Sequence, residues 1–156
     1  LSENTFAPYA TTDRAMIVTI LHRLEGSPAA LPAAFTDVPE GQYYAIPVAW
    51  ASSVGIVEGY EDATFRPESP ITREQLAAIL YRYARYKGLD ISVRGDMGRF
   101  PDAVSVSPYA ADAMSWAVGT GLIAGLDGAL QPDGAAGRAQ VAVILQRMCA
   151  GLLQMP

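Results

Sequence analysis

Three stretches of the chain place apolar side chains at the spacing of one face of an α-helix. In each stretch the apolar positions fall at i, i+3, i+4 and i+7, which puts them on a single stripe of an amphipathic helix. The spacing predicts three helices that begin near residues 12, 72 and 138. The stripes are Ile17, Ile20, Leu21 and Leu24; Leu76, Ile79, Leu80 and Tyr83; and Val141, Ile144, Leu145 and Met148.

Residues that favour helix ends flank these stripes. Thr72 followed by Gln75 forms a capping box, and Asp13 can cap the first helix. Gly137 is a weaker N-cap for the third helix because it has no side-chain oxygen. The three helices are predicted to end at glycines suited to a C-terminal cap, namely Gly26, Gly88 and Gly151.

A second kind of helix is centred on each tryptophan. Trp50 and Trp116 are each preceded by a tyrosine seven residues earlier and followed by a glycine five residues later. A helix that ends at a glycine C-cap fits this spacing. We therefore expect helices over about residues 43–54 and 108–120.

The whole pattern recurs with a period of about 60 residues, which indicates a tandem-repeat fold. Arg14, Arg73 and Arg138 occupy the same place in the three stripes, 59 and then 65 positions apart. A complete unit is a tryptophan helix, a glycine-containing loop and an arginine helix. We expect one all-α structural domain, in which the first unit lacks its first helix. Its parts are half of one unit over residues 1–28 and complete units over residues 35–88 and 100–151.

Composition and charge exclude several classes of function. The 156 residues carry a net charge of −5, and 51% of them are hydrophobic, which argues against a nucleic-acid binder and against a disordered chain. A single cysteine, Cys149, and a single histidine, His22, argue against a disulfide framework, a zinc site and a Ser–His–Asp triad. No apolar run reaches about 18 residues, so no membrane insertion is expected. We expect no metal, no cofactor and no enzymatic activity.

The ordered motifs of the repeat resemble the S-layer homology domain family. Phe35-Thr36-Asp37-Val38 precedes Trp50 and the Gly55–Gly59 segment, then Phe65-Arg66-Pro67 and Thr72-Arg73-Glu74-Gln75 follow, and the same order returns from Phe100. The resemblance covers nearly the whole chain. It implies a pseudo-threefold bundle, a three-pronged spindle, that anchors bacterial surface proteins non-covalently to secondary cell-wall polysaccharides, often pyruvylated ones. It also implies an extracellular location, at the bacterial cell wall or S-layer.

The third copy departs from the family pattern in two places. It has Leu130 where an aromatic residue is usual, and Ala136-Gly137-Arg138-Ala139 where the family has a pattern close to Ile-Thr-Arg-Ala-Glu. The arginine is present in all three copies. Because of the two departures, however, we expect the third pocket to be weaker or differently shaped.

The three arginines are the main candidates for ligand binding. A cation in the first turn of a helix is electrostatically unfavourable, so its recurrence at Arg14, Arg73 and Arg138 indicates a use. A guanidinium beside the free backbone N–H groups of a helix N-terminus would suit a carboxylate or a ketal acid. This matches the glycan that the resemblance implies, and Thr72 is a neighbouring candidate.

Two pairs of residues allow a structural explanation as well as a functional one. The arginines either pair with Asp37 and Asp102 or cap carbonyls between units, and an Asp–Arg pair would also orient a binding arginine. Gly59 and Gly125 are included as candidates because glycine permits a close approach, although a backbone requirement explains them equally well.

The remaining candidates are aromatic, histidine and cysteine side chains. Trp50 and Trp116 lie on the apolar face of their helices, so we expect a core role, with sugar stacking as the alternative. His22 falls on the face away from the apolar stripe and is expected at the surface. Cys149 is expected as a small core or boundary residue.

These observations lead to two functional hypotheses. The first is a cell-surface anchor that binds cell-wall polysaccharide in arginine-containing grooves between repeats. The alternative is a protein–protein assembly module of a surface protein, with the same fold and no glycan binding. A chain that starts at Leu1 without a methionine indicates a piece of a longer protein, and a covalently attached cargo domain is expected elsewhere in the parent chain.

The incomplete first unit predicts an exposed apolar surface. No tryptophan helix precedes the first arginine helix in this sequence, so its stripe is expected to lose part of its cover. An apolar patch of this size usually meets a partner. Three outcomes are open: the other helices close over the stripe, a second chain covers it in a homodimer, or a missing N-terminal half-repeat covers it in the longer protein. Of these we expect association.

Overall fold

The protein is described by a computed structural model over residues 7–155, which contain five α-helices and no extended β-strand. Residues 1–6 and residue 156 lie outside the described range. They include Phe6 of Phe6-Ala7-Pro8, the counterpart of Phe65-Arg66-Pro67 ahead of the first arginine. The predicted all-α class is confirmed, and the arginine helices begin within two residues of the predicted positions. The helices are α1 (Arg14–Leu24), α2 (Ala45–Ser53), α3 (Arg73–Tyr86), α4 (Ala111–Gly119) and α5 (Arg138–Arg147).

Short helical turns complete these elements. Three 3₁₀ turns, η1 (Met97–Arg99), η2 (Ala103–Ser105) and η3 (Pro108–Ala110), lead into α4. A π-helical turn, η4 (Met148–Leu152), continues α5. The predicted helix end at Gly151 is therefore wrong. A hydrogen bond of 2.9 Å from Leu153 N to Met148 O carries the helical winding past this glycine.

The predicted N-caps of the first two arginine helices are confirmed. Asp13 Oδ1 accepts from Met16 N at 2.7 Å. Thr72 and Gln75 bond reciprocally, with Gln75 N donating to Thr72 Oγ1 and Thr72 N donating to Gln75 Oε1. Gly137 caps α5 with no side-chain hydrogen bond, as expected from its missing side chain.

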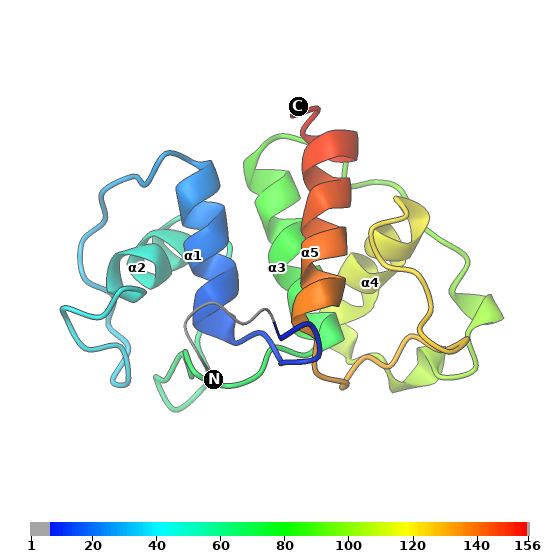
Figure 1. The fold of residues 1–156 in the computed structure, drawn as a ribbon, viewed down its shortest axis with the longest axis horizontal. Helices are drawn as coiled ribbons and strands as arrows, with labels where there is room; N and C mark the ends of the chain where they lie inside the picture. Colours follow the sequence, from blue (N-terminus) through cyan, green and yellow to red (C-terminus); the bar gives the residue numbers. More distant parts are fainter. Residues whose placement is uncertain (1–6, 156) are drawn as a thin grey trace.

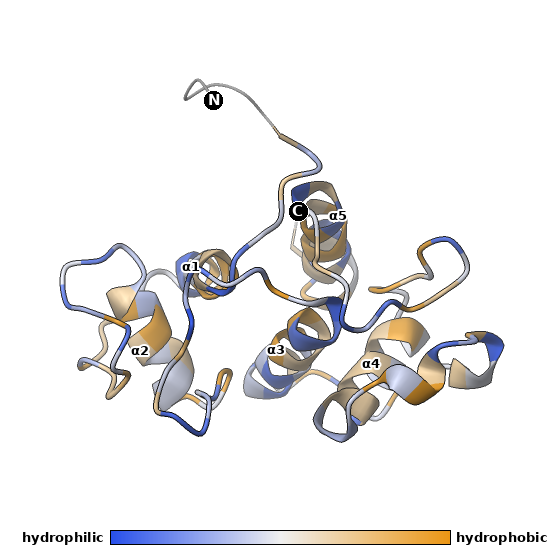
Figure 2. Cartoon of the chain, turned by 90° about the horizontal axis from the view of Figure 1, so that it is seen from below, coloured by the Kyte–Doolittle hydropathy of each residue, from blue (hydrophilic) through white to orange (hydrophobic). Residues whose placement is uncertain are grey.

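A ring of three backbone hydrogen bonds joins the repeats at the start of the arginine helices. Ile71 N donates to Thr12 O at 2.8 Å, Ala136 N donates to Ile71 O at 2.9 Å, and Thr12 N donates to Ala136 O at 3.0 Å. Each of these residues lies two positions before an arginine. The closed ring gives the predicted pseudo-threefold arrangement, and Figure 2 shows α1, α3 and α5 nearly end-on around it.

Each tryptophan helix packs on the arginine helix of the preceding repeat. α2 lies against α1, and α4 lies against α3 (Figure 1). The Trp50 and His22 ring centroids are 5.5 Å apart, and the Trp116 and Tyr81 centroids are 5.6 Å apart. Both indoles are in the core, with 3% and 0% of their surface exposed. The core role predicted for both tryptophans is therefore confirmed.

Because each tryptophan helix packs on the preceding repeat, the expectation that His22 lies at the surface is wrong. The side chain is 6% exposed rather than at the surface, and its Nε2 lies 2.8 Å from the carbonyl oxygen of Pro28. His22 faces away from the apolar stripe of α1, as predicted. That face is buried because the next repeat's helix α2 covers it.

The same packing leaves α5, rather than α1, as the arginine helix without a tryptophan helix beside it in residues 7–155. Ile17 and Leu21 of α1 are fully buried, so the prediction of an uncovered first stripe is wrong for these two residues. Helix α5 has no tryptophan helix of a following repeat beside it in residues 7–155 (Figure 2). Accordingly, Val143 is 43% exposed and Gln146, the counterpart of His22, is exposed.

Candidate functional site

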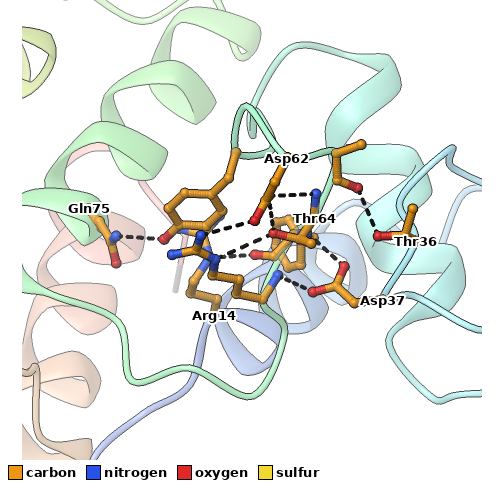
Figure 3. Close-up of polar contacts among 10 residues, drawn as sticks. Arg14, Thr36, Asp37, Asp62, Thr64 and Gln75 are labelled. Atoms are coloured by element: carbon orange, nitrogen blue, oxygen red, sulfur yellow. Dashed lines mark hydrogen bonds and ion pairs between the residues drawn. The ribbon is translucent and has the colours of Figure 1, made fainter.

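Two aspartates hold the loops that form the walls of the site. Asp37 accepts hydrogen bonds from the backbone N–H groups of Phe65 (2.8 Å) and Arg66 (2.7 Å), as Figure 3 shows around Asp37. Arg66 is thereby held at a φ of 56°, in the left-handed region that a non-glycine residue seldom adopts. The bonds fix the direction of the Phe65 carbonyl.

The third repeat has the same arrangement. Asp102 accepts from Leu130 N at 2.8 Å and from Gln131 N at 2.7 Å, and Gln131 has a φ of 51°. The two backbone N–H groups lower the pKa of the Asp102 carboxyl below its ordinary value, because they stabilise the charged form.

The arginines bond to the carbonyls of these loops rather than to the aspartates. Arg14 Nε donates to Phe65 O at 2.9 Å, and Arg73 Nε donates to Leu130 O at 2.7 Å. Neither arginine forms an ion pair with an aspartate or glutamate in the described residues. Of the structural explanations, carbonyl capping between repeats is confirmed and Asp–Arg pairing is not.

The first two backbone N–H groups of each arginine helix already have hydrogen-bond partners. Arg14 N donates to Ser69 O at 3.1 Å and Ala15 N donates to Pro67 O at 2.9 Å. The same bonds recur at α3 and α5, with carbonyls of the neighbouring repeat as acceptors. The expectation of free N–H groups for an anion is therefore wrong for the first two positions of each helix, because inter-repeat contacts use them. The ligand chemistry of these helix ends lies in the arginine side chains.

The candidate glycines are required by the packing of the loops. A Cβ at Gly59 would lie 2.3 Å from a Phe35 ring carbon, and one at Gly125 would lie 2.9 Å from Phe100. Gly59 also lines the groove beside Arg14, and its role in ligand binding stays a prediction. Thr72 uses its hydroxyl as the N-cap of α3.

The largest of three arginine-lined grooves contains the candidates Arg14 and Gly59, and we call it the Arg14 groove. It has a volume of about 740 Å³ and lies between α1, the loop of repeat 2 and the start of α3 (Figure 3). Its walls come from all three repeats, because Tyr109 closes one side. It is lined by Arg14, Val57, Glu58, Gly59, Tyr60, Glu61, Asp62, Arg66, Glu74, Gln75, Ala78, Ile79, Arg82 and Tyr109.

Arg14 is the buried cation of this groove. Its side chain is 6% exposed, and its guanidinium carbon lies 4.7 Å from the Phe65 ring centroid and 5.1 Å from that of Tyr60. Burial lowers the pKa of Arg14 from its ordinary value because it removes water from the charged group. Two other arginines of the groove are paired with carboxylates, with Arg66 Nη2 3.2 Å from Asp62 Oδ2 and Arg82 Nη2 3.5 Å from Glu58 Oε2.

Glu74 is a residue that the sequence analysis missed. Its carboxylate accepts from Ser107 N (2.9 Å), Ser107 Oγ (2.7 Å) and the Tyr109 hydroxyl (3.4 Å). Burial and Glu74 together raise the pKa of Tyr109 to about 12. Glu74 thus fixes the repeat 3 wall of the groove. Its place in the Thr-Arg-Glu-Gln motif was visible, but its partner lies 33 positions further along the chain.

Two further grooves accompany the other arginines. The Arg73 groove, of about 300 Å³, lies between Arg73, residues 122–126 and α5. The Arg138 groove, of about 470 Å³, lies between α5 and α1 and has Tyr43 and Arg138 on its rim. No loop corresponding to residues 57–62 covers the Arg138 groove in the described part of the chain. Trp50 and Trp116 line none of the three grooves.

Comparison with known proteins agrees with this repeat geometry. The model of the S-layer homology domain family matches residues 34–77 and 99–142, which are more than half of the chain. The chain belongs to the S-layer homology domain family. The membership assigns it to the bacterial cell surface, as a module that anchors proteins there.

Several relatives share this region. The chain is 32% identical over 151 residues to an endoglucanase of Bacillus sp. (strain KSM-635), covering 94% of this chain and 16% of the relative. It is 29% identical to a surface-layer 125 kDa protein of Lysinibacillus sphaericus (94% and 12%) and 31% identical to an exoglucanase of Acetivibrio thermocellus (93% and 13%). The chain thus spans less than a fifth of these relatives, and the enzymes among them match through this module.

No helix in residues 7–155 has the length and apolar composition that crossing a bilayer requires.

Proposed function

We propose that this chain is a non-covalent anchor that holds a surface protein to an acidic secondary cell-wall polysaccharide, of which pyruvylated sugars are one form. The observation that carries the proposal is the buried Arg14 guanidinium, which faces a groove of about 740 Å³ and has no carboxylate partner in the described residues. A buried charge without a partner is costly, and a ligand carboxylate would offset that cost.

The proposed contacts extend from Arg14 along the groove. Gly59 and Tyr60 form the loop wall, and Tyr109 forms the opposite wall. Asp37 and Asp102 support the site through the loops they hold, and Thr72 supports it through its helix cap. Arg73, Arg138 and Gly125 line the two neighbouring grooves, where the same family chemistry was expected.

Purified cell-wall sacculi test this proposal. We expect the chain to sediment with native sacculi and to lose binding after the secondary polymer is chemically removed. Retained binding to stripped sacculi, or none to native ones, would contradict it. Arg14→Ala should weaken binding about 5- to 150-fold, as expected for the loss of a charge-assisted hydrogen bond of about 1–3 kcal/mol. Arg85→Ala, at an exposed position of α3, removes the same charge outside the groove and should leave binding unchanged.

The second candidate is an assembly module, and one surface favours it. The Arg138 groove is mainly apolar, and Tyr43, which lines it, is 59% exposed. A homodimer or a preceding half-repeat would cover this surface. Sedimentation velocity at micromolar concentrations tests the homodimer, because a dimer requires an increase in sedimenting mass with concentration.

We also propose that the parent chain carries a further cargo domain, as expected for an anchor. The proposal is supported by the small share, 16% or less, of the relatives that this region represents. The molecular mass of the native protein extracted from cell walls tests it, because a cargo domain adds to the 16.6 kDa of this region.

A further inference from the structure

Aspartate followed by glycine occurs twice in the chain, and both pairs lie in the loop between α4 and α5. They are Asp127-Gly128 and Asp133-Gly134. This pairing favours attack of the glycine nitrogen on the aspartate side chain, because glycine has no Cβ to hinder the approach. Both aspartates are exposed to solvent. Residue type and exposure therefore do not distinguish the two sites.

The first pair forms the tip of a two-residue turn. Leu126 N donates to Ala129 O at 2.8 Å, and Ala129 N donates to Leu126 O at 3.1 Å. Asp127 and Gly128 have φ angles of 52° and 77°, as the central residues of a type I′ turn do. A Cβ added at Gly128 would meet no atom within 4 Å. The tip therefore lies in solvent and is closed by two backbone hydrogen bonds.

The reacting groups of this pair are not held by other parts of the fold. Gly128 N donates to no backbone acceptor in residues 7–155, and the Asp127 carboxylate forms no ion pair there. A rotation about the Cα–C bond of Asp127 brings its Cγ to Gly128 N, and the turn must open to allow it. Opening exchanges two exposed hydrogen bonds for bonds to water, which costs little. It also releases Asp127 from the left-handed region, which is unfavourable for a residue with a Cβ.

The second pair is held by its own turn and by a contact between repeats. Gly134 N donates to Gln131 O at 3.0 Å, so the nitrogen that would attack is already engaged. Gly134 O accepts from Arg73 N at 2.9 Å, at the start of α3. A rotation about the Cα–C bond of Asp133 would displace Gly134 and break this contact. The opening that the reaction requires therefore costs tertiary contacts at Asp133, whereas at Asp127 it costs only the turn.

We propose that Asp127 is a site of spontaneous isoaspartate formation and that the fold protects Asp133 from the same reaction. Gly128 N attacks Cγ of Asp127, a C–N bond forms, and the carboxyl oxygen leaves as water with the N–H proton, which gives a five-membered succinimide. Water then adds to one of the two ring carbonyls and that C–N bond breaks. Addition at the main-chain carbonyl gives isoaspartate, with the chain running through Cβ and Cγ, and addition at Cγ gives aspartate again. Water is the only co-reactant, and the mass of the chain does not change.

The modification changes the turn and one neighbouring groove. Isoaspartate adds a methylene group to the main chain between Leu126 and Ala129, so their two hydrogen bonds cannot both form. Leu126 lines the Arg73 groove, so the wall of that groove moves. The Arg14 groove has no residue of this turn in its walls. The inference therefore does not depend on the proposed anchoring function.

Incubation of the intact folded chain in mildly acidic buffer made with heavy-oxygen water tests the proposal. Each succinimide that reopens takes one oxygen atom from the solvent, so mass spectrometry counts the reaction at each aspartate. An endoprotease that cleaves before aspartate and not before isoaspartate identifies the rearranged product. We expect cleavage before Asp127 to be lost, and its uptake of heavy oxygen to be at least about tenfold faster than that of Asp133, because only Asp127 reacts through local opening. Equal rates at the two sites, a faster reaction at Asp133, or no uptake at Asp127 would overturn the proposal.

The same chain unfolded in urea shows whether the fold is the cause of the difference. Both pairs are followed by alanine, so we expect the two rates to become similar once the tertiary contacts of Asp133 are lost. A difference that persists in urea would show that local sequence, and not the fold, protects Asp133. Asp127→Ser is the matched variant, because it removes the reacting carboxyl from the turn. It should abolish heavy-oxygen uptake at residue 127 and leave the slow uptake at Asp133 unchanged, and uptake that continues at residue 127 would contradict the assignment.

Discussion

At the scale of single residues, the aspartate of one repeat and the arginine of the preceding repeat bind the same loop. Asp37 and Asp102 each use both carboxylate oxygens to hold two successive backbone N–H groups. The carbonyls of those loops then accept from Arg14 and Arg73. A carboxylate that holds two backbone donors stabilises the fold only while it is charged.

The lowered pKa of Asp102 predicts an acid-dependent loss of stability. Its folded pKa is below the ordinary value near 3.9, so its contribution is complete above that pH and is lost as pH falls through the folded pKa. Thermal unfolding between pH 7 and pH 2.5 should show Asp102→Asn less stable than the unaltered chain at pH 7, with the difference narrowing in acid. Asp133→Asn, at an exposed position, should follow the unaltered chain. A difference for Asp102→Asn that stays constant with pH would contradict the prediction.

At the scale of elements, each loop between a tryptophan helix and an arginine helix closes over an aromatic residue of its own repeat. Gly59 packs against Phe35, and Gly125 packs against Phe100. The Phe35 ring in turn lies 5.6 Å from that of Phe65, whose carbonyl binds Arg14. A side chain at the glycine would therefore disturb the wall of the groove as well as the core.

The loss of stability caused by a glycine-to-alanine substitution should increase as the space for the added Cβ decreases. Gly59→Ala places a Cβ 2.3 Å from Phe35 and 3.0 Å from Thr64 O, and we expect a loss of about 2–3 kcal/mol. Gly125→Ala, with a closest approach of 2.9 Å to Phe100, should cost about 1–2 kcal/mol. Gly151→Ala meets nothing within 4 Å and serves as the control. Urea unfolding of the three variants measures the order, and equal stability of Gly59→Ala and Gly151→Ala would refute it.

At the scale of the whole molecule, the ring of repeats is closed at the helix starts and open along α5. The backbone bonds between Thr12, Ile71 and Ala136 complete the pseudo-threefold arrangement. Outside the ring, α2 covers α1 and α4 covers α3, while the corresponding face of α5 has no such cover in residues 7–155. The open face lies on α5 because each tryptophan helix packs on the arginine helix of the preceding repeat.

A half-repeat added before the chain should therefore stabilise α5. We expect a fusion that places a copy of residues 34–64 ahead of Phe6-Ala7-Pro8 to raise the free energy of unfolding by about 1–3 kcal/mol. The added helix would bury the exposed part of Val143 and its apolar neighbours. Val143→Lys should remove most of this gain in the fusion and have little effect on the chain alone. Chemical denaturation measures both, and a fusion no more stable than the chain would show that α5 needs no cover.

The sequence alone was sufficient for the local structure and for the repeat. The helices, their N-caps and the spacing of the repeat could be predicted because each depends on residues a few positions apart. The evidence was the apolar spacing, Asp13, the Thr72–Gln75 capping box and the recurring arginines. The arginines and glycines of the grooves were identified for the same reason, because they keep a fixed place in each unit.

Tertiary structure alone decided which surfaces meet. Nothing in the spacing of α1 shows that α2 of the next repeat covers it, and this contact buries His22 and leaves α5 open. The side-chain partners of Arg73 likewise lie far along the chain, because its Nη groups donate to Gln140 Oε1 and Ala124 O, 67 and 51 positions away. The physical reason is that helix formation is governed by neighbours within about four residues, whereas burial, hydrogen-bond partners and groove charge depend on long-range packing.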